Sequence, residues 1–518
     1  MRVNCFTCMV CFYIKQEDIV MKAEKTSDIG ILVAAFKFVP LVVFALLVIL
    51  FKMDLLLAAP IATFCAVIVH MIVCKSRFEQ AFGQGLTSAK KIVLVLFILM
   101  FAYGTAECFM ATGVGAALIN LALELGVTAR SVALVSMIVT CLLSIATGTS
   151  WGTFAACAPI FLWLNHLVGG NVLLTVCCIA GGSCFGDNIG MISDVTVLSC
   201  GMQDVKIIDR LRHQLVWAFG CLILACGIVL MASSSLPNVQ GDVYAAISQI
   251  PQEAKDALLL ERPSALSLLE QVEQGIPYYM IIPLILVIVL SFMGLHTMIC
   301  LGVGMVSSLI FGMFAGTVTA EVWLEELLLN GFSDAGSWTI VMMLWVSAFG
   351  GIMNSMNAFD PLANLVVRIS KNVHQLMGWC GVMCLAGNMA LADEAAQVAT
   401  ISPIIRNIVE KNVECTDEEA EYTLRLRLAT FTSAMGIYGS ELVPWHCFPV
   451  FFASIANAVY PLYSFTTMDI ISRNYMSFIV VGSILVLTFI GWDRFIPYFA
   501  LPDDDRIKLR RNSGVKEH

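Results

Sequence analysis

The sequence predicts an all-α, polytopic membrane protein built from two inverted-topology repeats with broken transmembrane helices and re-entrant segments. The 518-residue chain has a mean hydropathy of +0.86 and only 13% charged residues, against about 25% in a soluble domain. Long apolar runs recur along it, and polar segments interrupt these runs at matching places in the two halves. These observations together predict the fold class.

The apolar runs are the candidate membrane spans. A helix needs roughly 20 mostly apolar residues to cross the hydrocarbon core of a bilayer. Such runs lie near residues 31–51, 53–74, 91–112, 131–148, 171–185, 215–233, 277–294, 296–316, 338–357, 376–391, 424–440 and 471–492. Several are short or broken, which predicts helices that do not cross the bilayer in one piece.

Basic residues in short connections predict the orientation of the chain. They form three groups: Lys75, Arg77, Lys90 and Lys91; Lys206, Arg210 and Arg212; and Arg494, Arg506, Lys508, Arg510 and Arg511. Because cytoplasmic loops are enriched in Lys and Arg, we assign all three groups to the cytoplasmic side of the cell inner (plasma) membrane, with a cytoplasmic C-terminus. The acidic segment between the halves then lies outside, so the two halves have opposite orientations.

This inversion predicts an internal duplication, and three segments match in the same order. The matched positions are Gly104 with Gly350, Pro159 with Pro403, and Gly186 with Gly436, at shifts of 246, 244 and 250 residues. A competing shift of 290 pairs Ser150 with Ser440 but does not keep three segments in order. Inverted repeats with broken helices are typical of secondary transporters, whose substrate binds near the membrane midplane at the repeat interface.

The chain therefore divides into five parts. These are an N-terminal tail (1–28), a first transmembrane repeat (29–234), an acidic extracytoplasmic loop (235–276), a second transmembrane repeat (277–492) and a basic cytoplasmic tail (493–518). Most cysteines lie inside the apolar runs, where we expect small buried thiols that act as packing residues.

The first polar interruption is "IATGTSWGTFAACAP", residues 145–159. Its glycines and proline predict an unwound helix, and Thr149 and Ser150 supply hydroxyl oxygens. Unwound backbone is tolerated at membrane depth only where it lines protein or a water-filled cavity, and half-helix ends coordinate Na⁺ in transporters. The alternative is a packing kink made of small residues, which membrane helices also favour.

The second interruption, "GDNIGMISDVT" at residues 186–196, places two acids between apolar runs. Asp187 and Asp194 are the candidate titrating groups, with oxygens from Asn188 and Ser193 beside them. A buried carboxylate can hold either a proton or a sodium ion, because each neutralises the same charge. That exclusive occupancy is the minimum requirement for an ion/proton exchanger. The alternative is that both acids cap a cytoplasmic loop near Arg210.

The repeat mate of the first interruption, residues 387–403, carries Asp393, Glu394 and Gln397. An acid at a membrane-helix centre costs about 2.5–3.5 kcal/mol on insertion scales, so its presence is a functional hypothesis. One of the two acids is expected to meet the ion, while the other pairs with Arg406 or Lys411. The alternative is that both simply cap the following helix.

The mate of the second interruption, "YGSELVPWHCFP" at residues 438–449, offers Ser440 and Glu441 as further ligands. His446 is either a coupling residue that titrates near neutral pH or a hydrogen-bonded filler. Glu107, an isolated acid inside a predicted span, fits gating or structure as well as it fits ion binding.

No sequence feature indicates an enzyme. The chain lacks an H-E-x-x-H motif and a phosphate-binding G-x-x-x-x-G-K-[ST] loop, which argues against primary pumping. We expect no resident metal and no cofactor apart from Na⁺ and H⁺ as transported or coupling ions. The expected partners are the lipid bilayer and a small cation or small organic ion, not nucleic acid, and a homodimer is compatible with this picture.

The ordered set "GTSWGT" (148–153), "FGDNIGMISDVTVL" (185–198), "RLRH" (210–213) and "GSELVPWH" (439–446) resembles the NhaC family of sodium/proton antiporters over roughly residues 30 to 490. In that pattern a Gly-Asp matches Gly186 and Asp187, and a later Ser-Asp matches Ser193 and Asp194. The chain departs from the pattern at Gly190 and Met191, where the family usually has Ser-Pro, and at Glu441, where it has proline.

The resemblance implies a secondary active transporter that exports Na⁺ or Li⁺ against inward H⁺ by alternating access. The family also includes exchangers of organic acids. The two departures point to altered ion selectivity or to an organic substrate, so the alternative is a Na⁺- or H⁺-coupled exchanger or symporter of small organic acids or amino acids.

Overall fold

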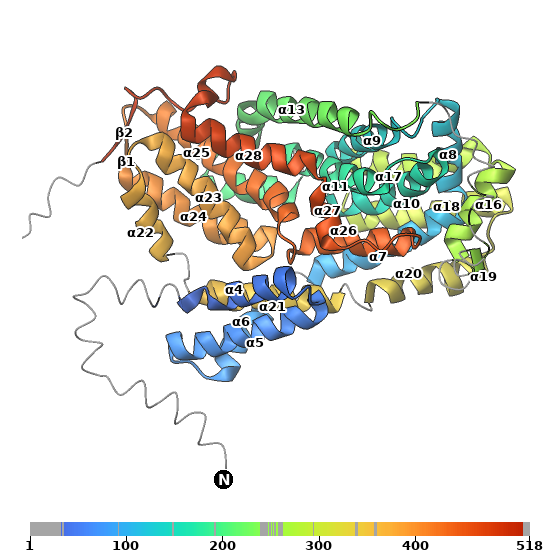
Figure 1. Cartoon of the computed structure of the whole chain (residues 1–518), viewed down its shortest axis with the longest axis horizontal. Coiled ribbons are helices and arrows are strands. Elements are labelled where there is room, and N and C mark those ends of the chain that lie inside the picture. Colours follow the sequence, from blue (N-terminus) through green and yellow to red (C-terminus); the bar gives the residue numbers. More distant parts are fainter. Residues whose placement is uncertain are drawn as a thin grey trace, which may run out of the picture.

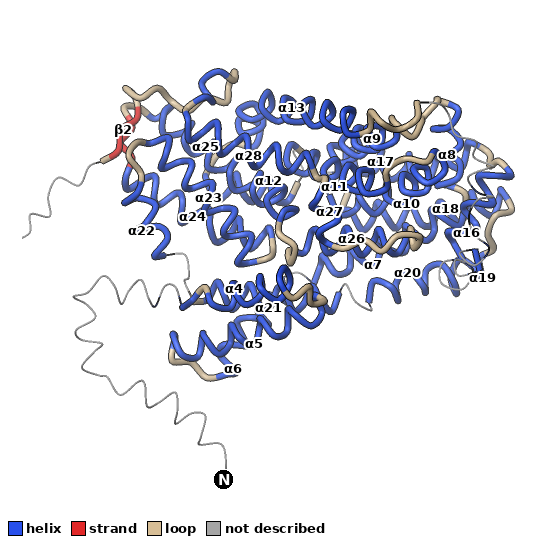
Figure 2. Tube along the Cα trace, viewed as in Figure 1, coloured by secondary structure: helices blue, strands red, loops and turns tan. Residues whose placement is uncertain are grey.

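The computed structural model describes residues 33, 36–91, 93–147, 150–190, 193–238, 263–293, 295–336, 340–356 and 360–510, with isolated positions between 247 and 259. The described chain is almost entirely helical, and one two-stranded sheet is its only strand structure (Figures 1 and 2). The predicted all-α class is confirmed. The N-terminal tail 1–28 lies outside the described residues.

The helices of the first half follow one another with short connections. In chain order they are α4 (Val39–Ala45), the π-helical η1 (Leu46–Leu50), α5 (Leu55–Cys74), α6 (Phe78–Lys91), α7 (Val93–Thr112), α8 (Val114–Glu124), α9 (Val132–Thr147), α10 (Ser150–Val168), α11 (Val172–Ile189), α12 (Asp194–Gln203) and α13 (Ile207–Ala232).

The second half begins after a short helix in the connecting segment. Its elements are α16 (Pro263–Gln274), η2 (Tyr278–Ile281), α17 (Ile282–Phe292), α18 (Thr297–Ala315), α19 (Ala320–Val322), η3 (Trp323–Leu328), α20 (Leu329–Asp334), α21 (Ile340–Ser355), α22 (Asp360–Ile369), α23 (Val373–Leu391), α24 (Glu394–Asn412), β1 (Val413–Cys415), α25 (Glu418–Ala434), η5 (Met435–Gly439), η6 (Ser440–Leu442), α26 (Cys447–Val459), α27 (Thr467–Ser472), α28 (Tyr475–Ile490), η7 (Trp492–Phe495) and β2 (Ile507–Leu509).

The described helices include five that are long and apolar enough to cross a membrane, or up to seven if each bent pair counts as one span. Two of the five, α10 and α11, are buried within the protein along most of their length. α10 was expected only as a broken stretch, because its glycine, proline and hydroxyl residues resemble an interruption. It is instead a continuous helix that begins at Ser150. The described cysteines are free thiols and most are buried, as expected of packing residues.

Helix interruptions fall at equivalent places in the two halves. α7 and α8 meet at a 65° bend at Gly113, whose backbone is left-handed (φ +107°). At the predicted shift of 246 residues, the equivalent position in the second half lies between α21 and α22. The junction of α9 and α10 corresponds to Ala392 (φ +53°), between α23 and α24. The break between α11 and α12 corresponds to the 50° bend that precedes α26.

Packing between the halves is reciprocal. α7 of the first half packs against α18 and α20 of the second, while α21 of the second half packs against α5 and α6 of the first (Figure 1). In the same way, α10 contacts α26 and α24 contacts α12. This exchange of equivalent neighbours supports the predicted duplication. The opposite orientation of the halves in a membrane stays a prediction.

Two ends of the molecule can be recognised from α13. Its 26 residues span about 39 Å at 1.5 Å per residue. Near its start, the Tyr422 hydroxyl of α25 donates to Asp209 (3.0 Å). Just beyond its end, the Arg130 amide donates to the Pro237 carbonyl (3.3 Å). The predicted basic connection with Lys206 and Arg212 and the start of the acidic connecting segment therefore lie at opposite ends of α13.

The described parts of the tail and of the connecting segment contact the helical body. β2 of the tail pairs antiparallel with β1, at the end of the molecule where α25 begins. α16 lies within the predicted acidic loop and packs against α7 and α8, where Gln271 Nε2 donates to the Ala111 carbonyl (2.6 Å). Both segments are thus tied to the helical body.

Candidate functional site

The centre of the candidate site is the break between α11 and α12. α11 ends at Gly190, whose backbone is extended, and Ser193 begins α12 as its N-cap by accepting from the Thr196 amide (3.3 Å). Gly186 lies within α11 and does not break it. A side chain at Gly186 would collide with the backbone at Ser144 and Ile145 of α9, so this glycine permits the close approach of α9 and α11.

Asp187 joins three helix ends. Its Oδ2 accepts hydrogen bonds from the Ser150 hydroxyl (2.8 Å) and the Ser150 amide (3.2 Å) at the start of α10, and its Oδ1 accepts from the Ser193 hydroxyl (2.6 Å) at the start of α12. The carboxyl is buried, at 4% exposure. Partially positive helix N-termini favour a negative charge at this position. The predicted grouping of Asp187, Ser150 and Ser193 is present in the structure.

Asn188 faces a buried arginine. Arg210 of α13 is fully buried and donates to the Asn188 carbonyl (3.1 Å), the Asn188 side-chain oxygen (2.9 Å) and the Thr196 hydroxyl (2.9 Å). Gln214 donates to the same Asn188 carbonyl (3.0 Å), and Ser433 of α25 donates to the Asn188 side chain (3.2 Å). This cluster connects both halves of the chain at the break.

Two predicted ligands are only partly described. Asp194 is the first residue of α12, four residues after Gly190, but its side chain lies outside the described part of the structure. Thr149, between α9 and α10, also lies outside the described residues. Their roles stay predictions.

Asp393 and Glu394 lie at the start of α24, half-buried. Asp393 is the N-cap and accepts from the Ala396 amide (2.7 Å), so the capping alternative holds for this residue. The expected ion pair with Arg406 or Lys411 is wrong, because both bases lie three or more turns further along the same continuous helix. Arg406 instead pairs with Glu410 (2.7 Å).

Gln397, one turn into α24, is fully buried beside the Cys384 thiol. Neither polar atom of its amide hydrogen-bonds to a nitrogen or oxygen of a described residue. The amide oxygen lies near Gly436 of η5, where an added Cβ would be 3.1 Å away. Asn388 of α23 donates to the Met435 carbonyl of the same π-helical segment. Buried amides with unused capacity are suited to receiving a ligand.

Ser440 and Glu441 follow in η6 and are both fully buried. The Ser440 hydroxyl donates to the Ile437 carbonyl (2.5 Å). Glu441 Oε2 accepts from the Ser477 hydroxyl of α28. The two predicted ligands therefore lie inside the protein, but they do not join the hydrogen bonds around Asp187.

His446 and Glu107 were the predicted coupling residues. His446 is fully buried and is the N-cap of α26, accepting from the Phe448 amide (3.3 Å). This geometry favours the filler interpretation. Glu107 is buried in α7, which packs against α10, α18 and α20, and its role stays a prediction.

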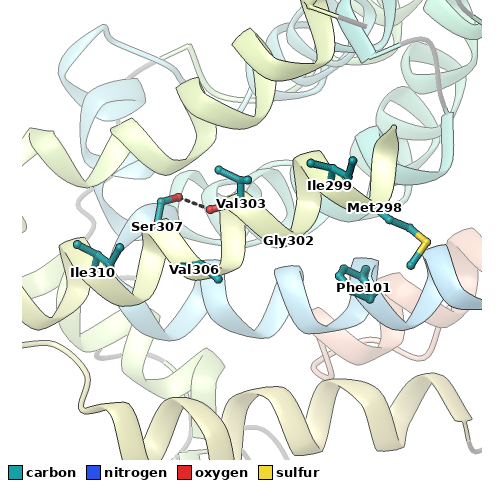
Figure 3. Close-up of a pocket in the computed structure, with 8 residues that line it drawn as sticks. All are labelled: Phe101, Met298, Ile299, Gly302, Val303, Val306, Ser307 and Ile310. Atoms are coloured by element: carbon teal, nitrogen blue, oxygen red, sulfur yellow. Dashed lines mark hydrogen bonds between the residues drawn. The ribbon is translucent and has the colours of Figure 1, made fainter. Parts of the chain in front are cut away.

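An apolar groove on α18 is not a candidate site. It has a volume of about 580 Å³ and lies between α18 and Phe101 of α7 (Figure 3). The only hydroxyl in its lining, that of Ser307, donates to the Val303 carbonyl (2.6 Å) within the same helix. Such a surface suits lipid chains. Among the described residues, no group of three or more His, Cys, Asp or Glu side chains could hold a metal ion.

Sequence reasoning missed several members of the cluster. Arg210 was assigned to a cytoplasmic connection, although an arginine within a long apolar helix is itself a functional signal. Gln214, one turn later on α13, accepts from Arg210 (3.1 Å) and was not considered. Ser433 and Ser477 carry no local signal, because their contacts depend on how distant helices pack.

Comparison with known proteins identifies the family of the chain. The sequence model described as the Na⁺/H⁺ antiporter family matches residues 19–234 and 182–492. The chain belongs to the Na⁺/H⁺ antiporter family. As an antiporter-family member it is a multi-pass membrane transporter that handles small cations across a lipid bilayer.

Three relatives show the range of this antiporter family. The chain is 22% identical to a malate-2H⁺/Na⁺-lactate antiporter of Bacillus subtilis, over 81% of this chain and 85% of the relative. It is 20% identical to the Na⁺/H⁺ antiporter NhaC of Alkalihalophilus pseudofirmus, over 73% and 78%. It is 22% identical to the arginine/ornithine antiporter ArcD of Halobacterium salinarum, over 68% and 69%.

Proposed function

We propose that this antiporter exchanges Na⁺ or Li⁺ for H⁺ at Asp187, exporting the metal ion against inward protons by alternating access. The observation that carries the proposal is the Asp187 carboxyl, buried where α10, α11 and α12 meet and bordered by the Ser150 and Ser193 hydroxyls. A carboxylate with hydroxyl oxygens is the ligand type that hard cations prefer.

The two ions compete for the same group. When Na⁺ is bound, the carboxylate oxygens and the two serine oxygens face the cation, and the serine hydrogens turn away. When the cation leaves, a proton neutralises the carboxyl, because an isolated charge in a dry interior is costly. A carboxyl that holds neither ion, or both ions at once, is not favoured. Each time the site changes the side of the membrane to which it opens, it therefore carries either one Na⁺ or one proton, in opposite directions.

The first test is the substitution Asp187→Asn in everted membrane vesicles with an acidic lumen. Adding Na⁺ or Li⁺ to wild-type vesicles is expected to release protons from the lumen, and Asp187→Asn is expected to abolish that release, because an amide carries no charge for either ion to neutralise. The same loss is expected of Asp194→Asn. Asp204→Asn, at a largely exposed position on the connection after α12, is the control and retains activity. Proton release that persists in Asp187→Asn contradicts the proposal.

A second candidate function is exchange of small organic ions coupled to Na⁺ or H⁺. Two of the relatives described above are antiporters of organic ions, and the buried Gln397 amide has donor and acceptor capacity that a bare cation does not require. Counterflow of radiolabelled lactate, malate and arginine in proteoliposomes distinguishes the two functions. Organic counterflow without cation-dependent proton movement favours the second candidate.

A further inference from the structure

Two buried amide side chains with unused oxygen atoms lie at the break between α23 and α24. Asn388 is in the last turn of α23, Gln397 lies one turn into α24, and neither side chain is exposed. Asn388 Oδ1, Gln397 Oε1 and Gln397 Nε2 make no hydrogen bond to a nitrogen or oxygen of a described residue. Buried polar atoms without such partners are rare in folded proteins, so a group of three calls for a bound ligand.

The surroundings of the two amides show which of their atoms a ligand would meet. Asn388 Nδ2 donates to the Met435 carbonyl of η5. The Cys384 thiol of α23 lies beside the Gln397 amide, and of the two polar atoms of that amide only the nitrogen can donate to sulfur. The Gln397 oxygen lies near Gly436, the residue after Met435. A ligand at this place therefore meets amide oxygens.

The space beside the Gln397 oxygen is small. A Cβ added at Gly436 would lie 3.1 Å from Gln397 Oε1, 3.4 Å from the Val398 side chain and 3.8 Å from the Val195 side chain. The absence of a side chain at Gly436 thus leaves room for about one methyl group. Such a space admits a small ion and excludes an organic molecule.

The charges around this space favour a cation. The C-terminal end of a helix carries a partial negative charge, and Asn388 lies in the last turn of α23. Glu394 precedes Gln397 by three residues, so its carboxylate lies on the same face of α24. The partial positive charge at the start of α24 is offset by Asp393, which accepts from the Ala396 amide (2.7 Å).

The chemistry of the two ligands favours a monovalent cation. Calcium and magnesium sites in proteins are built with carboxylates. Uncharged carbonyl oxygens, by contrast, replace the hydration shell of monovalent ions in selective channels. The oxygens of Asn388 and Gln397 are of this uncharged type, and Na⁺ is the monovalent ion that the antiporter family handles.

The amides also occupy the position that is equivalent to the Asp187 site. In the first half, Ser150 at the start of α10 donates to Asp187, which directly follows Gly186. In the second half, Gln397 near the start of α24 lies beside Gly436, which matches Gly186 at the predicted shift of 250 residues. Each half thus brings the start of one helix against the segment before its second break.

We propose that the amide oxygens of Asn388 and Gln397 bind a second Na⁺, separate from the ion exchanged at Asp187, with water completing its shell. Because an amide takes up no proton in the physiological pH range, this second ion binds without displacing one. The protein then holds two Na⁺, of which only one is exchanged for H⁺. The inference goes beyond the exchange at Asp187 and does not depend on it.

The first experiment counts Na⁺ on the purified, full-length wild-type protein. Equilibrium binding of radioactive Na⁺, measured by scintillation proximity at alkaline pH, gives the number of ions bound at saturation. Wild type is expected to bind two Na⁺ per protein. A count of one overturns the inference without any variant.

Variants then assign the second ion. Gln397→Met keeps the length of the side chain and removes its oxygen, so one Na⁺ is expected to remain. One is also expected in Asp187→Asn, and none in the double variant. Gln274→Met, at an exposed position of α16, is the matched control and binds two. Folded Gln397→Met protein that binds two Na⁺ overturns the inference.

Gly436→Ala serves if Gln397→Met does not fold. The added methyl group occupies the space beside the Gln397 oxygen and leaves both amides in place. At the Na⁺ concentration that saturates wild type, the count is expected to fall to one. Two ions bound to folded Gly436→Ala overturn the inference.

Two further outcomes separate this inference from the proposed functions. If wild type binds one Na⁺ and Gln397→Met loses the counterflow of organic ions, the amides bind an organic substrate and the inference is wrong. If wild type binds two Na⁺, of which Gln397→Met loses one, while proton release persists in Asp187→Asn, the second site stands and the exchange at Asp187 is wrong.

Discussion

Arg210 is the residue that holds the broken helix together. Its guanidinium replaces backbone partners that are lost where α11 ends, since it donates to the Asn188 carbonyl and to the Thr196 hydroxyl on either side of the break. It also donates to the side chains of Asn188 and Gln214. A planar, multiply donating group can satisfy four oxygens at once, which the single ammonium of lysine cannot.

Arg210→Lys is therefore expected to destabilise the protein even though the charge is kept. Each buried oxygen left without a donor costs about 1–3 kcal/mol, so the unfolding temperature of the detergent-purified protein should fall and Na⁺-dependent proton release should weaken. Arg212→Lys, at an exposed position two residues later on α13, is the matched control. A variant as stable and active as wild type would show that the network around Asn188 is dispensable.

At this scale the sequence predicted candidate ligands but not how their side chains meet. Asp187, Ser150 and Ser193 were all expected as ligands, because acids and hydroxyls in apolar runs are costly unless used. Their convergence on one carboxyl depends on the start of α10 docking against α11, which no local pattern encodes. Arg210 was missed as a ligand of the break because its position beside Lys206 and Arg212 resembles an ordinary basic connection.

At the scale of elements, the C-terminal tail binds to the connection between α24 and α25. We call this contact, made by β1, β2, Asp417 and Arg506, the clasp. The strand pairing of β2 with β1 is reinforced by Arg506, which donates to both oxygens of Asp417 (2.6 and 3.1 Å) and to Glu419 (2.8 Å). Arg506 holds the pKa of Asp417 well below its usual range. Because the pKa of Asp417 is lowered, its ionised carboxylate stabilises the clasp fully at any pH above the ordinary Asp pKa. This stabilisation is lost as the pH falls through the lowered pKa.

The clasp is thus expected to be insensitive to pH near neutrality but sensitive to salt, because the pair is exposed. Asp417→Asn keeps the N-cap of α25, since asparagine also caps well, and removes only the charge. Hydrogen exchange at the β2 amides should become faster in Asp417→Asn and in wild type at high salt. The exposed Asp505→Asn is the control. Equal protection of the β2 amides in wild type, in wild type at high salt and in Asp417→Asn would mean that strand pairing alone holds the tail.

Helix breaks were the most predictable elements and helix continuity the least. The break around Gly190 and Ser193 and the start of α24 were both expected as interruptions, because glycine and capping residues end helices, whereas the bend at Gly113 was not expected. We did not expect α10 to be a continuous helix, because it contains residues that break water-exposed helices. Within a membrane protein such residues are tolerated in a helix when neighbouring helices surround it. Burial of α10 on nearly all sides depends on the packing of both halves.

At the scale of the whole molecule, each half completes the other. α5 and α6 pack against α21, while their counterparts α18 and α20 pack against α7, so neither half can bury its own surfaces alone. The sequence predicted the duplication from sparse identities, but it could not predict this exchange of helices, which requires the three-dimensional arrangement. Two halves that share one interface can close that interface on one side while they open it on the other, as alternating access requires.

The last prediction tests whether the two halves have opposite orientations in the membrane. Leu125, exposed after α8, and Lys371, exposed between α22 and α23, are equivalent at the shift of 246. The structure places them at opposite ends, since His374 lies 3.6 Å from Asp504 of the tail and Arg130 lies beside Pro237. With exposed native thiols replaced, a membrane-impermeant maleimide should label Leu125→Cys in intact cells, and Lys371→Cys only in everted vesicles. Labelling of both cysteines from one side would exclude inversion, because equivalent connections of inverted repeats must lie on opposite faces of the membrane.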